Sequence, residues 1–157
     1  MLLLTFHIGN DQYAVAARQI IEILPLTRIQ PLPKSPDYVS GLLDYRGRPV
    51  PVIDLCQLTL SRPFNKVLSS RIILVNYSDQ NGDEHALGLI AEKVTETITI
   101  PAEQFSDCGV SLTDTPYLGK VTRKDGRMLK YIEINQLLPE AVRALLFQPA
   151  TRQAGNE

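Results

Sequence analysis

The first residues of the chain alternate between two kinds of side chain. The positions that would share one face of a strand are all apolar: Leu2, Leu4, Phe6 and Ile8. Side chains two residues apart lie on the same face of a β-strand, so this pattern predicts a strand. Turn-forming residues follow at 9–11, and an extended pattern resumes at 12–15. The two segments are therefore predicted to form a β-hairpin.

Strand patterns continue through most of the chain. Residues 71–77 form the clearest apolar run, and the Asn81-Gly82 step behind it is typical of a tight hairpin turn. Returning strands are expected at 85–91 and 94–100. A further hairpin turn is predicted at Lys124-Asp125-Gly126, between strands at 118–122 and 128–133.

Prolines define the irregular parts. Residues 25–36 contain four of them, and proline cannot donate a ladder hydrogen bond, so this segment is predicted to be an irregular connection. One helical turn is expected at 37–39. Pro49 and Pro51 place the start of the next strand at a sheet edge or a bulge. Only residues 139–147 are predicted to form a true helix, with Pro139 in its first turn.

The two halves of the chain resemble each other weakly. The matching pairs lie about half a chain apart: 13–15 with 85–87, 20–24 with 94–98, and 53–58 with 132–137. Such a repeat predicts two similar small β-barrels, although chance similarity between β-rich segments would look the same. A lobe of half this length is only marginally stable alone, so the two lobes are expected to share one core.

Residues 20–24 are predicted to form a strand with apolar side chains on both faces. If Ile21 and Ile23 face the core, then Ile20 and Leu24 are exposed on either side of Glu22. Exposed apolar residues around one charge suit a partner-binding patch. The alternative is that both faces are buried against the other lobe.

Gly41 and Gly47 bracket a short segment that contains Asp44, Tyr45 and Arg46. A tight turn at Gly47 would hold Arg46 close to Asp44 or Glu22. The guanidinium group is a planar fork suited to paired hydrogen bonds with a carboxylate. An ordinary surface arginine would have the same spacing.

The composition narrows the classes of function. The chain has 157 residues, of which 44% are hydrophobic and 21% charged, as in an ordinary globular domain. A net charge of −1 gives no field for binding a polyanion such as nucleic acid. With two Cys and two His, the chain cannot build a four-cysteine zinc site, and Cys56 and Cys108 are expected to be reduced structural thiols. No apolar run approaches the ~20 residues needed to cross a bilayer, and no signal peptide is expected.

Familiar catalytic motifs are missing from the sequence, among them phosphate-binding loops, zinc-protease motifs and nucleophile elbows. His7 and His85 are expected to be surface or half-buried side chains. Asp54 ends a strand, as the phospho-acceptor of a receiver domain does, but the companion acidic pair is not apparent. We therefore predict no catalytic residue, cofactor or metal.

One block of the sequence resembles a known family. It reads Gly41-Leu42-Leu43-Asp44-Tyr45-Arg46-Gly47 and continues as Val50-Pro51-Val52-Ile53-Asp54-Leu55. This block is similar to the pattern of the CheW-like coupling proteins of bacterial chemosensory pathways. Weaker matches lie at 9–15, 21–23, 88–94 and 127–138, in the order in which the family pattern has them. The resemblance therefore covers residues 2–138.

The resemblance implies two five-stranded SH3-like barrels around a shared core. Residues 2–148 would form one domain of two intertwined subdomains, and residues 149–157 a flexible tail. The family acts without catalysis as a cytoplasmic adaptor at membrane receptor arrays. It joins the cytoplasmic hairpin tip of a chemoreceptor, a methyl-accepting chemotaxis protein, to the regulatory domain of a CheA-type histidine kinase.

The resemblance also assigns the site. By position, Glu22 and Arg46 match a charge pair of the family near the receptor and kinase contacts, and Ile20 matches an apolar contact. The predicted partner-binding residues are Ile20, Glu22, Gly41, Asp44, Tyr45, Arg46 and Gly47. Asp44-Tyr45 replaces the usual Asn-Leu, and Pro49 replaces an apolar residue. These departures fit a paralogue that controls surface attachment or second-messenger synthesis at least as well as the main chemotaxis adaptor.

Two other classes of function stay open at this point. A small β-barrel could bind single-stranded nucleic acid, which requires a basic groove with stacking aromatic side chains. Tyr45-Arg46 is an example of that combination, but the tyrosines are not generally interleaved with Lys or Arg. A small enzyme with an unrecognised site is the other alternative.

Overall fold

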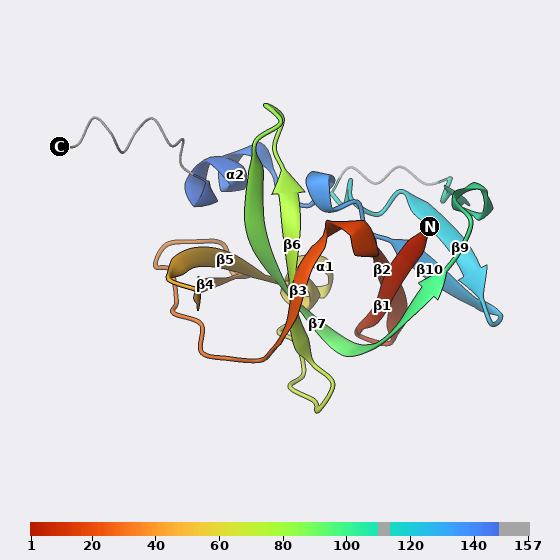
Figure 1. The fold of residues 1–157 in the computed structure, drawn as a ribbon, viewed down its shortest axis with the longest axis horizontal. Coiled ribbons are helices and arrows are strands. Elements are labelled where there is room, and N and C mark those ends of the chain that lie inside the picture. The colour runs from red at the N-terminus through yellow and green to blue at the C-terminus, as the bar shows by residue number, and fades with distance from the viewer. Residues whose placement is uncertain (110–113, 148–157) are drawn as a thin grey trace.

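The computed structural model describes residues 1–109 and 114–147 (Figure 1). Strands dominate the described part. They are β1 Leu2–Ile8, β2 Asp11–Ala16, β3 Ile20–Pro25, β4 Val39–Tyr45, β5 Arg48–Asp54, β6 Arg71–Ser78, β7 Glu84–Thr99, β8 Ser106–Asp107, β9 Lys120–Lys124 and β10 Arg127–Tyr131. The α-helices are α1 Leu55–Leu60 and α2 Glu140–Leu146, and three short 3-10 turns are η1 Ala17–Gln19, η2 Ala102–Gln104 and η3 Ile134–Gln136.

The strands form two lobes joined by one long strand. We call the group β3, β4, β5, β6 and the first part of β7 lobe 1, and the group β1, β2, β8, β9, β10 and the last part of β7 lobe 2. Figure 1 shows β7 passing from one lobe to the other. Within lobe 1 it pairs with β5 and β6, and within lobe 2 with β1. Lys93, where β7 leaves lobe 1, has a positive φ of 48°.

The predicted hairpins are confirmed. Antiparallel pairs form between β1 and β2, between β6 and β7, and between β9 and β10. Gly82 and Gly126 have φ of 83° and 77°, which tight hairpin turns require and glycine adopts without strain. The strands expected at 85–91 and 94–100 are one continuous strand, β7.

The edge position of the two strand prolines is also confirmed. Pro49 and Pro51 lie opposite Asp44 and Leu42 of β4. β5 pairs with β7 only from Val52 onward. The prolines thus occupy the part of β5 that has a partner strand on one side, where a missing N–H costs no ladder hydrogen bond.

One large hydrophobic core is shared by both lobes. Phe6, Tyr13 and Val15 of lobe 2 pack in the same cluster as Ile73 and Tyr77 of lobe 1, and all are nearly inaccessible to solvent. Each lobe adds a smaller cluster of its own. Burying one such side chain contributes roughly 1.5–3 kcal/mol, so the shared cluster stabilises both lobes together.

The two lobes repeat one arrangement. In lobe 1, the end of β5 runs parallel to β7 and continues into α1. In lobe 2, β10 runs parallel to β2, and η3 follows it. These are the segments that match in the internal repeat, residues 53–58 and 132–137. A mostly β fold of two small barrels, with a short C-terminal helix, is what the sequence predicts.

Two local predictions were wrong. Residues 55–60 form helix α1, which was not expected. Asp54 begins it, because its Oδ1 accepts hydrogen bonds from the N–H groups of Cys56 and Gln57 at 3.0 and 3.2 Å. Residues 37–39 contain no helical turn: 37 and 38 are in a plain turn, and Val39 already belongs to β4.

The proposed tail, residues 149–157, lies outside the described residues. Within the described part, no helix is both long enough and apolar enough to cross a membrane.

Candidate functional site

The tip of the β4–β5 hairpin is a two-residue turn. Arg46 and Gly47 have φ of 52° and 82°, and Tyr45 pairs with Arg48 across the strands. Two successive positive φ values match the twist of the flanking strands. The carboxylate of Asp44 accepts a hydrogen bond from the Gly47 N–H at 2.9 Å. The turn therefore fixes the backbone conformation at Arg46 and with it the direction in which this side chain projects.

Glu22 on β3 is the second part of the site. Its Oε1 accepts a hydrogen bond from the Tyr45 hydroxyl at 2.5 Å and lies 3.4 Å from Nη2 of Arg46. The guanidinium carbon of Arg46 lies 5.1 Å from the centroid of the Tyr45 ring. Three side chains from two sheet segments thus form one polar cluster, which we call the Glu22 cluster: Glu22, Tyr45 and Arg46.

The Glu22 cluster is open to solvent. The side chain of Arg46 is 76% exposed and that of Glu22 is 39% exposed. An exposed ion pair contributes about 0–1 kcal/mol to stability. The hydrogen bond to Glu22 raises the pKa of Tyr45 above its ordinary value, with a smaller contribution from burial. The Tyr45 hydroxyl is protonated at neutral pH, as an ordinary tyrosine is, and it donates its hydrogen bond to Glu22.

Two predicted site residues have packing positions. Gly41 is buried, with a positive φ of 139°, and a Cβ there would lie 2.0 Å from the carbonyl oxygen of Gln30. Ile20 is half-buried against the shared core. Of the seven predicted residues, the structure brings five together at the hairpin and β3, namely Glu22, Asp44, Tyr45, Arg46 and Gly47.

The predicted orientation of β3 was wrong. Ile21 and Ile23 are the exposed side chains, 41% and 42% accessible, while Ile20, Glu22 and Leu24 are half-buried. A bulge interrupts the pairing of β3 with β6 between Ile20 and Glu22. Glu22 is partly exposed, and Tyr45 and Arg46 supply donors to its carboxylate.

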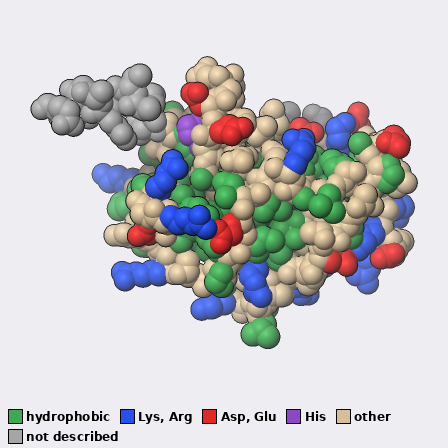
Figure 2. Space-filling model, viewed as in Figure 1, with side chains coloured by type: hydrophobic (Ala, Val, Ile, Leu, Met, Phe, Trp, Pro, Cys, Tyr) green, Lys and Arg blue, Asp and Glu red, His purple; other side chains and the backbone are tan. Residues whose placement is uncertain are grey.

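A surface groove of about 880 Å³ begins beside the Glu22 cluster. It runs between the β4–β5 hairpin and the end of α2, and its lining includes Ile21, Tyr45, Arg46, Pro49, Leu146 and Phe147. Figure 2 shows apolar side chains gathered across this face of the molecule, with basic side chains standing around β4 and β5. The sequence patterns did not indicate Ile21, Leu146 or Phe147 as site residues, although the end of the predicted helix is apolar.

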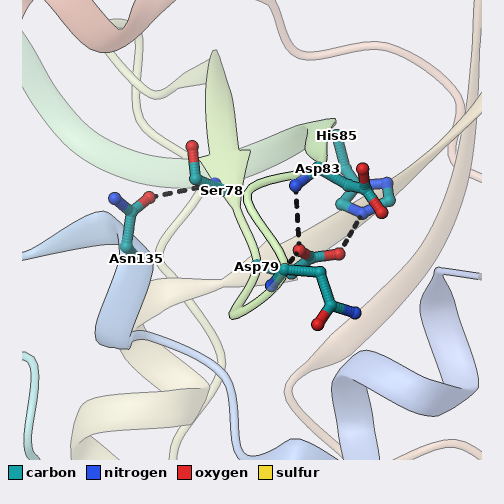
Figure 3. Close-up of polar contacts among 6 residues, drawn as sticks. Ser78, Asp79, Asp83, His85 and Asn135 are labelled. Atoms are coloured by element: carbon teal, nitrogen blue, oxygen red, sulfur yellow. Dashed lines mark hydrogen bonds and ion pairs between the residues drawn. The ribbon is translucent and has the colours of Figure 1, made fainter.

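The ends of β6 and β7 beside their turn line the other side of this groove, with Asn76, Glu84 and His85. Nε2 of His85 lies 2.9 Å from Asp79 Oδ2, and the other oxygen of Asp79 accepts hydrogen bonds from the N–H groups of Asn81 and Asp83 (Figure 3). The contact with His85 holds the pKa of Asp79 below its ordinary value. The His85 ring stacks on Phe147 with the centroids 4.3 Å apart. His85 thereby ties the end of α2 to the sheet.

The remaining candidates for chemistry have structural partners. Asp54 is 6% exposed, caps α1, and also accepts a hydrogen bond from the Phe64 N–H at 3.1 Å. Cys56 is buried, and burial raises the pKa of its thiol to about 11. In the part of the chain that the structure describes, no three His, Cys, Asp or Glu side chains lie close enough together to hold a metal ion. The arrangement at the hairpin is suited to binding a carboxylate beside an apolar surface.

Comparisons with known proteins agree with this picture. A family model described as CheW-like domain matches residues 2–142. The chain is 26% identical over 137 residues to the chemotaxis protein CheW of Thermotoga maritima, with 87% of each chain covered. It is 25% identical over 146 residues to the protein of the same name from Klebsiella aerogenes, covering 91% of this chain and 84% of that one. The crystal structure of the scaffolding protein TtCheW from Thermoanaerobacter tengcongensis has a similar fold, with a TM-score of 0.77, 24% identity, and 88% and 87% of the two chains covered.

Proposed function

The chain belongs to the CheW-like domain family, and we propose that it is a non-catalytic adaptor that couples chemoreceptors to a CheA-type histidine kinase. As a member of this family it is a scaffold protein of chemotaxis-type signalling. The partners proposed for it are the cytoplasmic hairpin tip of a chemoreceptor and the regulatory domain of the kinase. Its proposed place is the cytoplasm, beneath membrane receptor arrays.

The Glu22 cluster is the observation that carries the proposal. It presents an exposed guanidinium on a short, tightly turned hairpin, and the exposed side chain of Ile21 lines the same groove as Arg46. Arginine next to aromatic and aliphatic residues is typical of the energetically dominant part of a protein interface. A scaffold requires surfaces of this kind and requires no reacting groups.

The seven residues predicted from the sequence divide into three roles in this proposal. Arg46 would contact the partner, with Glu22 and Tyr45 forming the cluster around it. Asp44 and Gly47 would fix the turn that presents Arg46. Gly41 and Ile20 would act indirectly, by keeping the connector and β3 in place. Tyr45 differs from the leucine usual in the family and changes the chemistry of the surface, which fits a chemosensory system with an output other than motility at least as well as the main chemotaxis pathway.

Direct titration tests the proposal. The full chain is titrated with the purified regulatory domain of the CheA-type kinase from the same organism, and separately with a soluble receptor hairpin fragment. We expect a dissociation constant of about 10–100 µM or tighter for the kinase domain. Arg46→Ala should weaken binding at least about tenfold while changing the free energy of unfolding by no more than about 1 kcal/mol.

A matched control separates binding from general charge effects. Arg123 is an exposed arginine on β9 of lobe 2, so Arg123→Ala removes the same charge far from the hairpin in the fold. It should bind as the parent protein does. Absence of binding by the folded parent protein, or equal losses in the two arginine variants, would contradict the proposal.

A further inference from the structure

The two hydrogen-bond donors of the Glu22 cluster aim at the same oxygen atom. The Tyr45 hydroxyl reaches Oε1 of Glu22 at 2.5 Å, within the range of a strong hydrogen bond to a carboxylate. Nη2 of Arg46 lies 3.4 Å from that oxygen, outside the ordinary range for an N–H donor. Glu22 is therefore bound primarily to Tyr45, and the ion pair with Arg46 is secondary.

Arg46 consequently keeps most of its binding capacity. A guanidinium group has five N–H donors, and Arg46 directs one of them at Glu22 and none at the other described residues. Asp44, the nearest other acid in the hairpin, is engaged by the Gly47 N–H. The Tyr45 ring lies under the guanidinium and supports its orientation without using a donor.

We propose that Tyr45 is a positioning residue: it holds Glu22 in place, and so leaves the guanidinium of Arg46 available for a carboxylate of the partner protein. This inference rests on the proposed adaptor function, and names the chemical group that the hairpin recognises. A leucine at position 45 has no hydroxyl, so Glu22 would then accept from Arg46 alone. The replacement by tyrosine thus converts an internal ion pair into an outward-facing anchor.

The partner group follows from the shape of the donor set. A planar fork of parallel N–H groups matches the two oxygens of a carboxylate. The groove beside Arg46 is lined by apolar side chains such as Ile21 and Phe147. The partner segment should therefore place an acidic side chain next to apolar ones.

A tyrosine titration tests the contact without any partner. The ultraviolet absorbance of ionised tyrosine is followed with rising pH in the parent protein, in Tyr45→Phe and in Glu22→Gln, with circular dichroism to confirm that the fold persists. The difference between the parent and Tyr45→Phe isolates Tyr45. We expect it to ionise above the ordinary value for tyrosine and to move back toward that value in Glu22→Gln, because the hydrogen bond to a charged acceptor is lost. An unchanged titration in Glu22→Gln would overturn the assignment.

A double-mutant cycle tests the consequence for binding, with the kinase regulatory domain as the probe. Tyr45→Phe should weaken binding about three- to tenfold, since Arg46 is drawn back to Glu22. In the Glu22→Gln background the same change should have little effect, because no charge competes for Arg46. Arg46→Lys should not restore full affinity, since an ammonium group lacks the fork.

The outcomes separate this inference from the proposed function. Equal affinity of Tyr45→Phe and the parent protein, together with loss of binding in Arg46→Ala, refutes the positioning role and leaves the adaptor function standing. Full affinity of Arg46→Lys refutes the recognition of a carboxylate by a fork. If the probe binds neither parent nor variant, the proposed function fails, and the tyrosine titration still decides whether Tyr45 or Arg46 holds Glu22.

Discussion

Replacing Gly41 by alanine should destabilise the protein far more than the same change at a glycine with open surroundings. The backbone of Gly41 has a φ of 139°, which L residues rarely adopt, and such strain costs about 1–3 kcal/mol. The added Cβ would also lie 2.0 Å from the Gln30 oxygen and 2.7 Å from the Gln30 carbonyl carbon. These are backbone atoms and cannot rotate away.

Relief of that overlap has its own cost. Gln30 and Leu42 exchange two backbone hydrogen bonds of 2.9 and 2.8 Å, which hold the proline-rich connector against β4. Moving the connector would break them, at about 0.5–1.5 kcal/mol each. The total for Gly41→Ala is therefore about 2–6 kcal/mol. In a chain of this size it corresponds to a fall in the melting temperature of roughly 8–16 °C for a central value of about 4 kcal/mol.

Equilibrium unfolding in urea, with a thermal scan, measures the effect. Gly126→Ala is the control, because Gly126 also has a positive φ, 77°, but a Cβ there would meet no atom within 4 Å. In the control, the free energy of unfolding should fall only by the conformational cost of the positive φ, about 1–2 kcal/mol. If Gly41→Ala is no less stable than Gly126→Ala, the close approach of the connector does not exist in solution and the reasoning fails.

Three further predictions concern buried or hydrogen-bonded groups. Asp54→Ala should lower the free energy of unfolding by about 2–3 kcal/mol, because three backbone N–H groups lose their acceptor. Asp54→Asn keeps one acceptor oxygen, so it should lower the free energy of unfolding less. Equal losses of the two variants in urea unfolding would contradict the capping role. The pKa of Asp79 is lowered in the folded state, chiefly by the contact with His85, so its carboxylate stabilises the fold above its unfolded pKa and this contribution is lost as the pH falls below about 4. Asp79→Asn should accordingly flatten the acid side of the stability profile, and an identical profile for parent and variant would speak against the contact. Burial raises the pKa of the Cys56 thiol to about 11, so Cys56 should resist alkylation by iodoacetamide in the native protein at neutral pH and react once the chain is unfolded. Mass spectrometry measures the labelling. Rapid labelling of the native protein would contradict the burial of this thiol.

The elements that the sequence predicts best have short-range causes. The β1–β2, β6–β7 and β9–β10 hairpins combine period-two alternation with glycine-containing turns, and both signals lie within a few residues of each other. Helix α1 escaped prediction because the apolar residues of β5 run on into it without a change of composition. The signal that could have shown it was Asp54, a residue type favoured at helix N-termini.

The orientation of β3 depends on a distant segment. Apolar residues occupy both faces of this strand, so alternation alone cannot choose between them. The expected exposure of Ile20 and Leu24 was wrong, because Ile21 and Ile23 are the exposed side chains. Tyr45 and Arg46, more than twenty residues later, supply donors to the partly exposed carboxylate of Glu22. A buried or half-buried charge is tolerated where it is paired, and only the fold shows the pairing.

The sequence predicts the residues at the tip of the β4–β5 hairpin as candidates, but not which of them binds Glu22 most closely. The spacing of the hairpin predicted Arg46 close to Asp44 or Glu22, and the resemblance to a family pattern paired it with Glu22. That Tyr45 reaches Glu22 more closely than Arg46 does follows from the distances of 2.5 and 3.4 Å. The wall of the groove at Phe147 depends on how α2 folds back onto the β6–β7 turn, which no local pattern encodes.

The path of β7 limits how this protein can be recombined with its relatives. Lobe 2 takes its strands from both ends of the chain, and the strand that completes it begins inside lobe 1. Neither half of the coding sequence therefore corresponds to a physical half of the molecule. A chimaera that exchanges one lobe between two such proteins must cross over at several points and must divide β7 near Lys93. Functional diversity in this architecture is therefore expected to arise by substitution at surfaces such as the Glu22 cluster rather than by exchange of whole lobes.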